Sequence, residues 1–312
     1  MKLPFPATAV LSALVLASAC APNEPWQART LIFFDTVCDI NLSCSELEYI
    51  EAEQEISRIF ETVEALFAPR AADASSPLVL RLYGRAQEAY RRSGGAFDIT
   101  IAPVLELWGM YNGQRRRIPT PEEIHSALAL VGMEKIAQQP GELRLAPGMG
   151  LDWGGIAKGF GVDLAAQAMI ERGIEKGFIN AGGDLYCWGT NPEARPWRIG
   201  VQHPRRQGFL AILNITNLAA ATSGDYQRYF EVEGVRYHHI FDPKTGYPVR
   251  GKQSVTVIGP ETTVCDALST ALFVSQRPED ILKAYPEYGA ICVSEAGKIT
   301  LAGKKFNVSF GR

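Results

Sequence analysis

Residues 152–159 read Asp-Trp-Gly-Gly-Ile-Ala-Lys-Gly. A short apolar segment leads into paired glycines, and the residues from Ile156 to Arg172 have the pattern of a helix that ends at Gly173. Glycines let a backbone approach a ligand closely, and the N–H groups at the start of a helix attract anions. Lys158 adds a positive charge at this point. The stretch therefore predicts an anion-binding turn. By itself it fits a structural turn equally well, and it matches neither G-x-x-x-x-G-K-[ST] nor G-x-G-x-x-G.

The bulk composition is that of a globular protein. The chain has 312 residues, enough for one large domain or two smaller ones, and 46% of them are hydrophobic. The 31 basic and 34 acidic residues leave a net charge of −3, and no run of basic residues is present. We therefore expect no nucleic-acid binding.

The first twenty residues differ from the rest. Lys2 precedes an apolar run, residues 7–17, that is too short to span a bilayer, and small residues then lead to Cys20. This pattern predicts a secretory signal over residues 1–20. It also resembles a bacterial lipoprotein signal, in which Cys20 becomes lipidated, although Ala17 stands where leucine is usual. Plain cleavage of the signal is the alternative.

The remainder of the chain predicts an α+β fold. We expect a linker over residues 21–30 and a domain over residues 31–312, mainly helical up to about Ala146 and rich in strands after it. Capping residues mark helix starts at Ser45 and Thr120. Further helices are expected at residues 78–92, 156–172, 263–274 and 279–284. Mostly antiparallel strands are expected at residues 31–34, 142–146, 151–153, 178–188, 197–202, 210–216, 229–241, 254–258 and 288–301.

The cysteine positions permit one disulfide without requiring it. Cys38 and Cys44 lie close together in a loop-like segment, and an exported protein could pair them. Their spacing is not that of a zinc site. Cys265 and Cys292 lie in apolar stretches, so we expect them in the core.

Three polar clusters follow the opening stretch. They read Asn-Ala-Gly-Gly-Asp at 180–184, Ala-Thr-Ser-Gly-Asp-Tyr at 221–226 and His-His-Ile-Phe-Asp-Pro-Lys-Thr-Gly at 238–246. Each by itself also fits an ordinary turn. His239 stands out because imidazole exchanges protons near neutral pH, but a single histidine is more often structural.

A fourth cluster reads Asp-Ala-Leu-Ser-Thr at residues 266–270. Asp266 and Thr270 are four residues apart, so on a helix their side chains lie on one face. A carboxylate and a hydroxyl, joined by a backbone carbonyl, would form an all-oxygen site for Mg²⁺ or Ca²⁺. The alternative is an aspartate placed near a helix start for its interaction with the helix dipole.

Together and in order, these clusters resemble the ApbE family of FAD:protein FMN transferases. The family pattern reads approximately D-x-G-G-I-A-K-G, N-x-G-G-D, A-T-S-G-D-Y, H-I-x-D-P-x-T-G and D-A-L-S-T-A, and the chain carries all five between residues 152 and 271. Residues 97–100, with Pro103 and Trp108 after them, match a further family segment. The resemblance covers roughly residues 31–312 and implies a T-fold-like architecture of antiparallel sheets and packed helices.

The resemblance implies a bacterial enzyme outside the cytoplasm, a lipoprotein of the inner membrane that faces the periplasm. It would bind FAD and Mg²⁺, move FMN to a Thr or Ser hydroxyl of an acceptor flavoprotein (a periplasm-facing redox subunit), and release AMP. An Mg²⁺-dependent FAD pyrophosphatase is one alternative, because water and a protein hydroxyl use the same site. A non-catalytic FAD-binding lipoprotein is the other.

The resemblance also implies roles for single residues. Asp266 and Thr270 would hold Mg²⁺ with the carbonyl of Gly155, and Lys158 would stabilise the pyrophosphate charge. His239 is the candidate for handling the acceptor's proton, together with Asp266 as the second catalytic residue.

Asp242 or a metal-bound water is the alternative to His239 for handling the proton of the acceptor hydroxyl. Phe34 stands where the family usually has a flavin-contacting methionine, and we expect it to stack instead. The expected cofactor-binding residues are Phe34, Ala96, Phe97, Asp98, Asp152, Lys158, Ile240 and Ser269.

Overall fold

The computed structural model describes residues 25–68, 75–111 and 116–311. The signal and Cys20 lie outside these residues. The helices are α1 (Glu46–Phe67), α2 (Pro77–Ser93), α3 (Ala102–Leu107), α4 (Pro121–Leu128), α5 (Ala157–Glu171), α6 (Thr262–Val274) and α7 (Pro278–Lys283), with 3₁₀ turns at Ile99–Ile101 and Met133–Lys135. Within the described ranges, no helix has the length and apolar character needed to cross a membrane.

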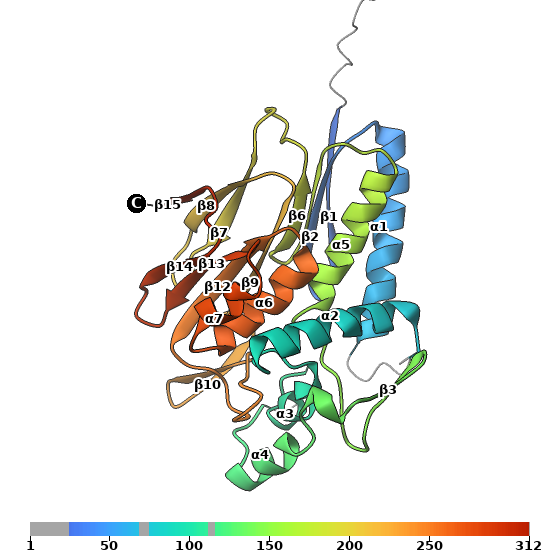
Figure 1. Cartoon of the computed structure of the whole chain (residues 1–312). Helices are drawn as coiled ribbons and strands as arrows, with labels where there is room; N and C mark the ends of the chain where they lie inside the picture. Colours follow the sequence, from blue (N-terminus) through green and yellow to red (C-terminus); the bar gives the residue numbers. More distant parts are fainter. Residues whose placement is uncertain (1–24, 69–74, 112–115, 312) are drawn as a thin grey trace, which may run out of the picture.

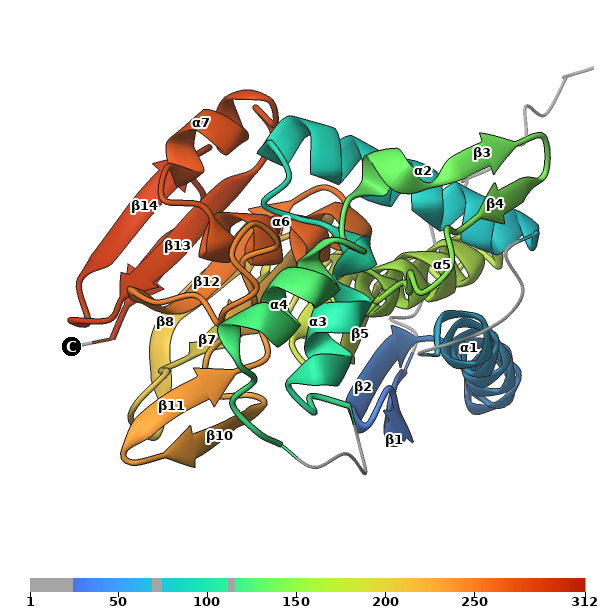
Figure 2. The same ribbon diagram turned by 90° about the horizontal axis from the view of Figure 1, so that it is seen from below.

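One large sheet organises the molecule (Figures 1 and 2). Its order is β1-β2-β5-β6-β9-β12-β13-β14, and neighbouring strands pair antiparallel. These strands are β1 (Trp26–Phe33), β2 (Thr36–Ser43), β5 (Gly177–Ala181), β6 (Asp184–Trp188), β9 (Leu218–Gly224), β12 (Lys252–Gly259), β13 (Gly289–Ser294) and β14 (Ile299–Gly303).

Helices cover one face of this sheet and a smaller sheet packs on the other. Figure 1 shows α5 and α6 lying in front of the large sheet, with α1 beside α5. Side chains of the large sheet such as Ile258 and Ile291 share a core with Leu213 of the small sheet. The small sheet is β7 (Trp197–Gln202), β8 (Phe209–Ile215) and β15 (Val308–Phe310), and two hairpins are β3 (Ala137–Gln139) with β4 (Glu142–Arg144) and β10 (Tyr229–Val232) with β11 (Val235–His238).

The expected helix starts and stops are confirmed. Ser45 and Thr120 each form a capping box with a glutamate three residues on, Glu48 and Glu123. Helix α2 ends at Gly94, whose φ of 63° is left-handed and so is best met by glycine. The expected boundary at Ala146 does not separate two cores, because α2 from the first half packs with α6 from the second in one cluster.

Several strand boundaries differ from expectation. The first strand already begins at Trp26, within the range assigned to a linker. Residues 151–153 form no strand, since the N–H of Asp152 donates to Ile99 O in a loop instead. Strands β2, β3, β9 and β15 were not expected, and β2 occupies the segment that was assigned to a loop. The sequence of β9 is Leu-Ala-Ala-Ala-Thr-Ser-Gly, which has low intrinsic strand preference.

The structure excludes the disulfide between Cys38 and Cys44 that the sequence left open. Cys38 lies in β2 and Cys44 directly follows that strand, so the five extended residues between them hold their Cα atoms about 20 Å apart. A disulfide requires Cα atoms within about 7 Å. Both residues are buried and neither forms a disulfide, which also holds for Cys187, Cys265 and Cys292.

The start of α6 is capped from a neighbouring helix. Its own N-cap residue, Glu261, makes no side-chain cap. Asp163 of α5 accepts instead from the N–H groups of Thr262 and Thr263, both at 2.8 Å, and from Thr263 Oγ1 at 2.5 Å. A carboxylate at this point also matches the positive end of the helix dipole.

Replacing Asp163 with alanine is expected to lower the free energy of unfolding by about 2 kcal/mol, because three donors lose their acceptor. Urea unfolding of the two proteins measures the difference. Asp163→Asn keeps one acceptor oxygen and should lie between them. An unchanged urea midpoint in the alanine variant would show that water replaces the cap without cost.

Candidate active site

Helix α6 presents the expected oxygen ligands on one face, beside the glycine-rich turn. A Cβ on Gly155 would lie 3.1 Å from Thr270 Oγ1 and 3.2 Å from the Phe97 ring, so a side chain at this position would be crowded by both. Thr270 Oγ1 also lies 3.2 Å from Ser223 Oγ. The structure thus brings together Gly155, Thr270 and Phe97 from three separate segments.

Asp266 is held where α5 and α6 cross. Its carboxylate is 4% exposed, and Oδ2 accepts from the N–H of Gly159 at 3.1 Å. The helices approach so closely that a Cβ on Gly159 would lie 2.5 Å from Thr262 O. Because the first N–H groups of a helix have no partner within it, the start of α5 is fixed on this carboxylate.

Lys158 lies between two buried carboxylates. Its Nζ is 2.9 Å from Asp184 Oδ2, 3.8 Å from Asp266 Oδ2 and 3.2 Å from Gly154 O. Burial acts to lower the pKa of Lys158, but the charges of Asp184 and Asp266 outweigh it and raise the pKa. Burial and the charge of Asp184 raise the pKa of Asp266 to about 7. The site therefore concentrates charge away from water.

A divalent cation fits this oxygen set. Within the part of the chain that the structure describes, no three His, Cys, Asp or Glu side chains gather to hold a metal. Asp266, Thr270 and a backbone carbonyl of the glycine-rich turn offer a small set of ligands, and all of them are oxygen atoms. Mg²⁺ is commonly bound by one or two carboxylates together with substrate phosphates and water.

Asp152 and Asp98 support the turn. Asp152 Oδ1 accepts from the N–H of Gly154 at 3.0 Å, and its Oδ2 accepts from Tyr111 Oη at 3.1 Å. Asp98 Oδ1 accepts from the N–H and the hydroxyl of Thr100, at 2.8 and 2.6 Å. Burial raises the pKa of both carboxyl groups. The oxygen Asp98 Oδ1 therefore caps its own loop, next to Phe97.

His239 lies at the base of the β10–β11 hairpin. Its N–H donates to Arg228 O at 3.0 Å, and Nδ1 lies 3.2 Å from the same oxygen. A carbonyl oxygen only accepts, so Nδ1 carries the proton and Nε2 is left as an acceptor. Burial lowers the pKa of His239 to about 3, and the charges of Arg228 and Lys158 act in the same direction.

A model of the ApbE family matches residues 34–291. The chain belongs to the ApbE family. The FAD:protein FMN transferase of Haemophilus influenzae is 37% identical over 190 residues, which are 58% of this chain and 55% of that protein. The transferase of Treponema pallidum is 30% identical over 255 residues, 73% of this chain and 70% of that protein. The chain thus spans little more than half the length of the first of these curated relatives.

Solved ApbE structures confirm the expected architecture. The ApbE protein of Thermotoga maritima superposes with a TM-score of 0.82 at 32% identity and covers 89% of this chain and 97% of its own. The flavin transferase ApbE of Vibrio cholerae gives a TM-score of 0.79 at 27% identity, with 90% and 98% covered. The mixed fold of helices and antiparallel sheets is therefore that of this family.

The β1–β2 turn of this ApbE-family chain has an unusual backbone. Phe34 and Asp35 both have a positive φ, 56° and 55°, as a two-residue hairpin turn requires. Aspartate is one of the few residues other than glycine that tolerates this backbone. The Phe34 ring packs on Phe60 at 5.1 Å and on Gly161, where a Cβ would lie 3.1 Å from it.

Other expected residues of this ApbE-family site face inward. Ile240 is buried in the core, and Ala96 is half-buried against it. Ser269 Oγ donates to Asp266 O at 2.8 Å and lies 2.7 Å from Ser223 Oγ, so it joins α6 to β9. Asp242 Oδ1 accepts from the N–H of Lys244 at 2.8 Å within its own turn.

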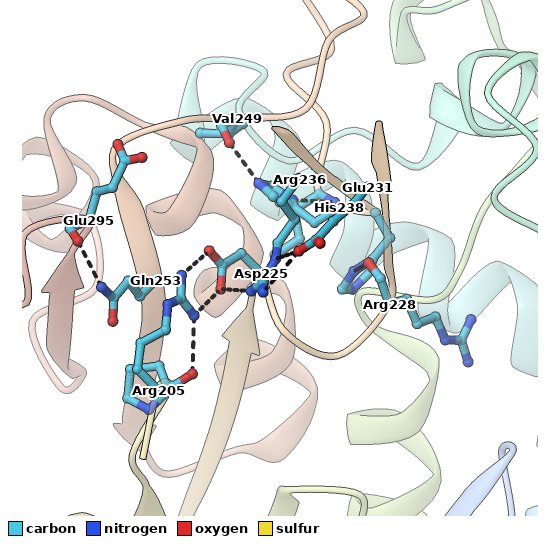
Figure 3. Close-up of polar contacts among 12 residues, drawn as sticks. Arg205, Asp225, Arg228, Glu231, Arg236, His238, Val249, Gln253 and Glu295 are labelled. Atoms are coloured by element: carbon cyan, nitrogen blue, oxygen red, sulfur yellow. Dashed lines mark hydrogen bonds and ion pairs between the residues drawn. The ribbon is translucent and has the colours of Figure 1, made fainter. Parts of the chain in front are cut away.

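An ionic network fixes the hairpin that carries His239 (Figure 3). Asp225 lies at the end of β9 and pairs with both guanidinium nitrogens of Arg205, at 2.8 and 2.5 Å. Arg236 of β11 approaches Asp225 Oδ1 at 3.8 Å and Glu231 of β10 at 3.4 Å. Figure 3 shows Arg228 pointing away from these pairs. Asp225 therefore joins the loop that carries Arg205 and strand β11 to the end of β9.

Sequence reasoning left two site residues without a role. Asp184 ends the second glycine-rich cluster, and only the fold shows that it meets Lys158. Arg228 is exposed, and its charge lowers the pKa of His239, which places it at the site. The sequence signal for Arg228 was weak, since it is one polar residue in an ordinary hairpin.

His238 gives a pH-dependent contribution to stability. It is buried, and its Nδ1 accepts from Ile240 N at 3.2 Å, so Nε2 donates to Val249 O at 2.7 Å. Burial lowers the pKa of His238. As pH falls through about 6.5, the unfolded chain takes up a proton before the folded one, and stability is lost. We expect the stability advantage of the native protein over His238→Gln to shrink between pH 7.5 and 5.5 in urea unfolding. An advantage that stays constant over this range would contradict the assignment.

Proposed function

We propose that this chain is an FAD:protein FMN transferase. The P–O–P bond of FAD breaks, the FMN phosphorus forms a new bond to a Thr or Ser oxygen of an acceptor protein, and AMP leaves. The hydroxyl proton leaves the acceptor in the same reaction. Family membership supports this proposal, as do the curated relatives that carry this name.

One observation carries the chemistry. The start of α5, the ammonium of Lys158 and the oxygens of Asp266 and Thr270 converge on one glycine-rich turn. A diphosphate needs backbone N–H groups, a fixed positive charge and a divalent cation, because catalysis of phosphoryl transfer is mostly positioning and charge stabilisation.

Mg²⁺ would be held by Asp266, Thr270 and the Gly155 carbonyl, and when bound it would neutralise charge on the diphosphate. The ammonium of Lys158 would add a fixed positive charge for the phosphate oxygens. Asp152 holds the turn through the N–H of Gly154. Phe97 packs on Gly155, and Phe34 offers the exposed part of its ring to the flavin.

His239 is proposed to accept the acceptor's proton. Its Nε2 is the unprotonated nitrogen, because Nδ1 donates to Arg228 O. The pKa of about 3 keeps the ring neutral in the free protein. The negative charge of a bound diphosphate favours the protonated ring and so raises its basicity.

The test uses the form lacking residues 1–20 with FAD, Mg²⁺ and a candidate acceptor domain. The denatured mixture is separated on a gel and viewed under ultraviolet light. A fluorescent acceptor band that EDTA removes supports transfer and its cation requirement together. Free FMN and AMP without a labelled band point to a pyrophosphatase, and unchanged FAD points to a binding protein.

We also propose export and lipidation at Cys20, so that the enzyme and its acceptor flavoprotein meet on the periplasmic side of the inner membrane. The sequence of residues 1–20 supports this proposal. Cells that express the full chain should incorporate labelled palmitate into it, and Cys20→Ala should abolish the label. Equal labelling of both proteins would overturn the assignment.

A further inference from the structure

Asp184 is buried beside the site without a role in the reaction described above. It is 3% exposed and opens β6 directly after a tight turn. Gly182 and Gly183 have φ values of 64° and 101°, and Asn180 Oδ1 accepts from the N–H of Gly183 at 2.9 Å. The turn fixes the backbone, so the Asp184 carboxylate has a defined position.

Two carboxylates lie near the ammonium of Lys158. Its Nζ is 2.9 Å from Asp184 Oδ2 but 3.8 Å from Asp266 Oδ2. An ammonium group has three N–H donors, and here Gly154 O is a further acceptor, at 3.2 Å. The Lys158 side chain is 29% exposed, so part of it stays accessible to a ligand.

Without Asp184, the nearest carboxylate to the ammonium would be Asp266. An ammonium bound directly to Asp266 competes with any cation for the same oxygens, because like charges in a buried site repel strongly. Asp184 thus keeps Lys158 at a distance from the carboxylate that the cation needs.

We propose that Asp184 is a positioning residue that acts through Lys158: it holds the ammonium off Asp266, so that Asp266 stays available to a divalent cation. This inference rests on the cation site of the proposed function. It differs from a role as a direct ligand, in which the charge of Asp184 would itself attract the cation.

A double-mutant cycle separates the two roles. Binding of Mn²⁺ alone, without nucleotide, is measured by the loss of the free-ion EPR signal in the purified full-length protein. The four proteins are the native one, Asp184→Asn, Lys158→Gln and the double variant. Circular dichroism and the urea midpoint confirm that each is folded.

We expect Asp184→Asn to weaken Mn²⁺ binding roughly tenfold when Lys158 is present, and to have no effect in the Lys158→Gln background. Asp184→Glu should recover binding, since it restores the counter-ion. Equal weakening in both backgrounds would overturn the positioning role in favour of direct attraction. No Mn²⁺ binding by the native protein would overturn it too and would remove the cation site of the proposed function. Normal Mn²⁺ behaviour with no flavin transfer would leave this inference standing and refute the transferase.

Discussion

Asp266→Ala is expected to reduce cation-dependent release of AMP from FAD by roughly 10³-fold or more, while the protein stays folded. The change removes the only carboxylate proposed as a cation ligand and leaves the diphosphate charge uncompensated by metal. It also removes a buried acid whose pKa is raised to about 7, so the folded state loses an unfavourable group as well as a bond to Gly159. Chromatography of AMP against time measures the rate, with and without EDTA.

The matched control for this variant is Asp163→Asn. Both aspartates contact the first turns of the α5–α6 pair, but Asp163 caps α6 through Thr262 and Thr263 and lies outside the proposed chemistry. The Asp163→Asn variant should have a lower urea midpoint and should retain AMP release at a temperature where it is folded. If the Asp266→Ala protein were fully active, the metal assignment would be wrong. A rate that falls equally in both variants would mean that helix placement, and not the ligand, limits the reaction.

Local signals in the sequence predicted the elements well where a side chain acts on its own neighbours. The capping boxes at Ser45 and Thr120 need only residues three positions apart, so their effect is visible without the fold. The turn of the β10–β11 hairpin is equally local, because Glu233 and Gly234 close it at positive φ. The antiparallel sheet followed from short strands joined by such turns.

Strand β9 shows where this reasoning fails. It lies in the middle of the large sheet, yet it is built from alanine, threonine and serine. Its small side chains are explained by α6, which packs on it so closely that Ser223 reaches Ser269 and Thr270. Strand preference reflects packing with neighbours, and these neighbours are more than 40 residues away in the chain.

The candidate site likewise has features that the local sequence predicts and features that only the fold creates. The spacing of Asp266 and Thr270 is a property of one helix, and both lie on its site face as expected. The partnership of Lys158 with Asp184 depends on how β6 meets the start of α5, which no local pattern encodes. Asp98 Oδ1 caps a 3₁₀ turn, a role that the following Thr100 could have suggested, and the contact of Asp98 with the cofactor stays a prediction.

The second large effect is expected for Gly159→Ala, at the crossing of α5 and α6. The added Cβ would lie 2.5 Å from Thr262 O and 2.9 Å from Asp266 Cβ. Neither neighbour is a flexible side-chain end, so the helices must separate. Overpacking of this kind costs roughly 3 kcal/mol. Alanine normally favours a helix over glycine, so a loss of stability here isolates the cost of the close approach.

Gly84→Ala is the matched control, because the same substitution should have the opposite sign. Gly84 lies inside α2, and a Cβ there would meet nothing within 4 Å. Alanine has less conformational freedom than glycine in the unfolded chain, so this substitution should stabilise the protein by roughly 0.5–1 kcal/mol. Urea unfolding gives both values, and AMP release should fall only in Gly159→Ala, whose N–H no longer reaches Asp266. If both variants proved stabilised, α5 and α6 would have room to move apart. The close crossing would then not be what holds Asp266 at the turn.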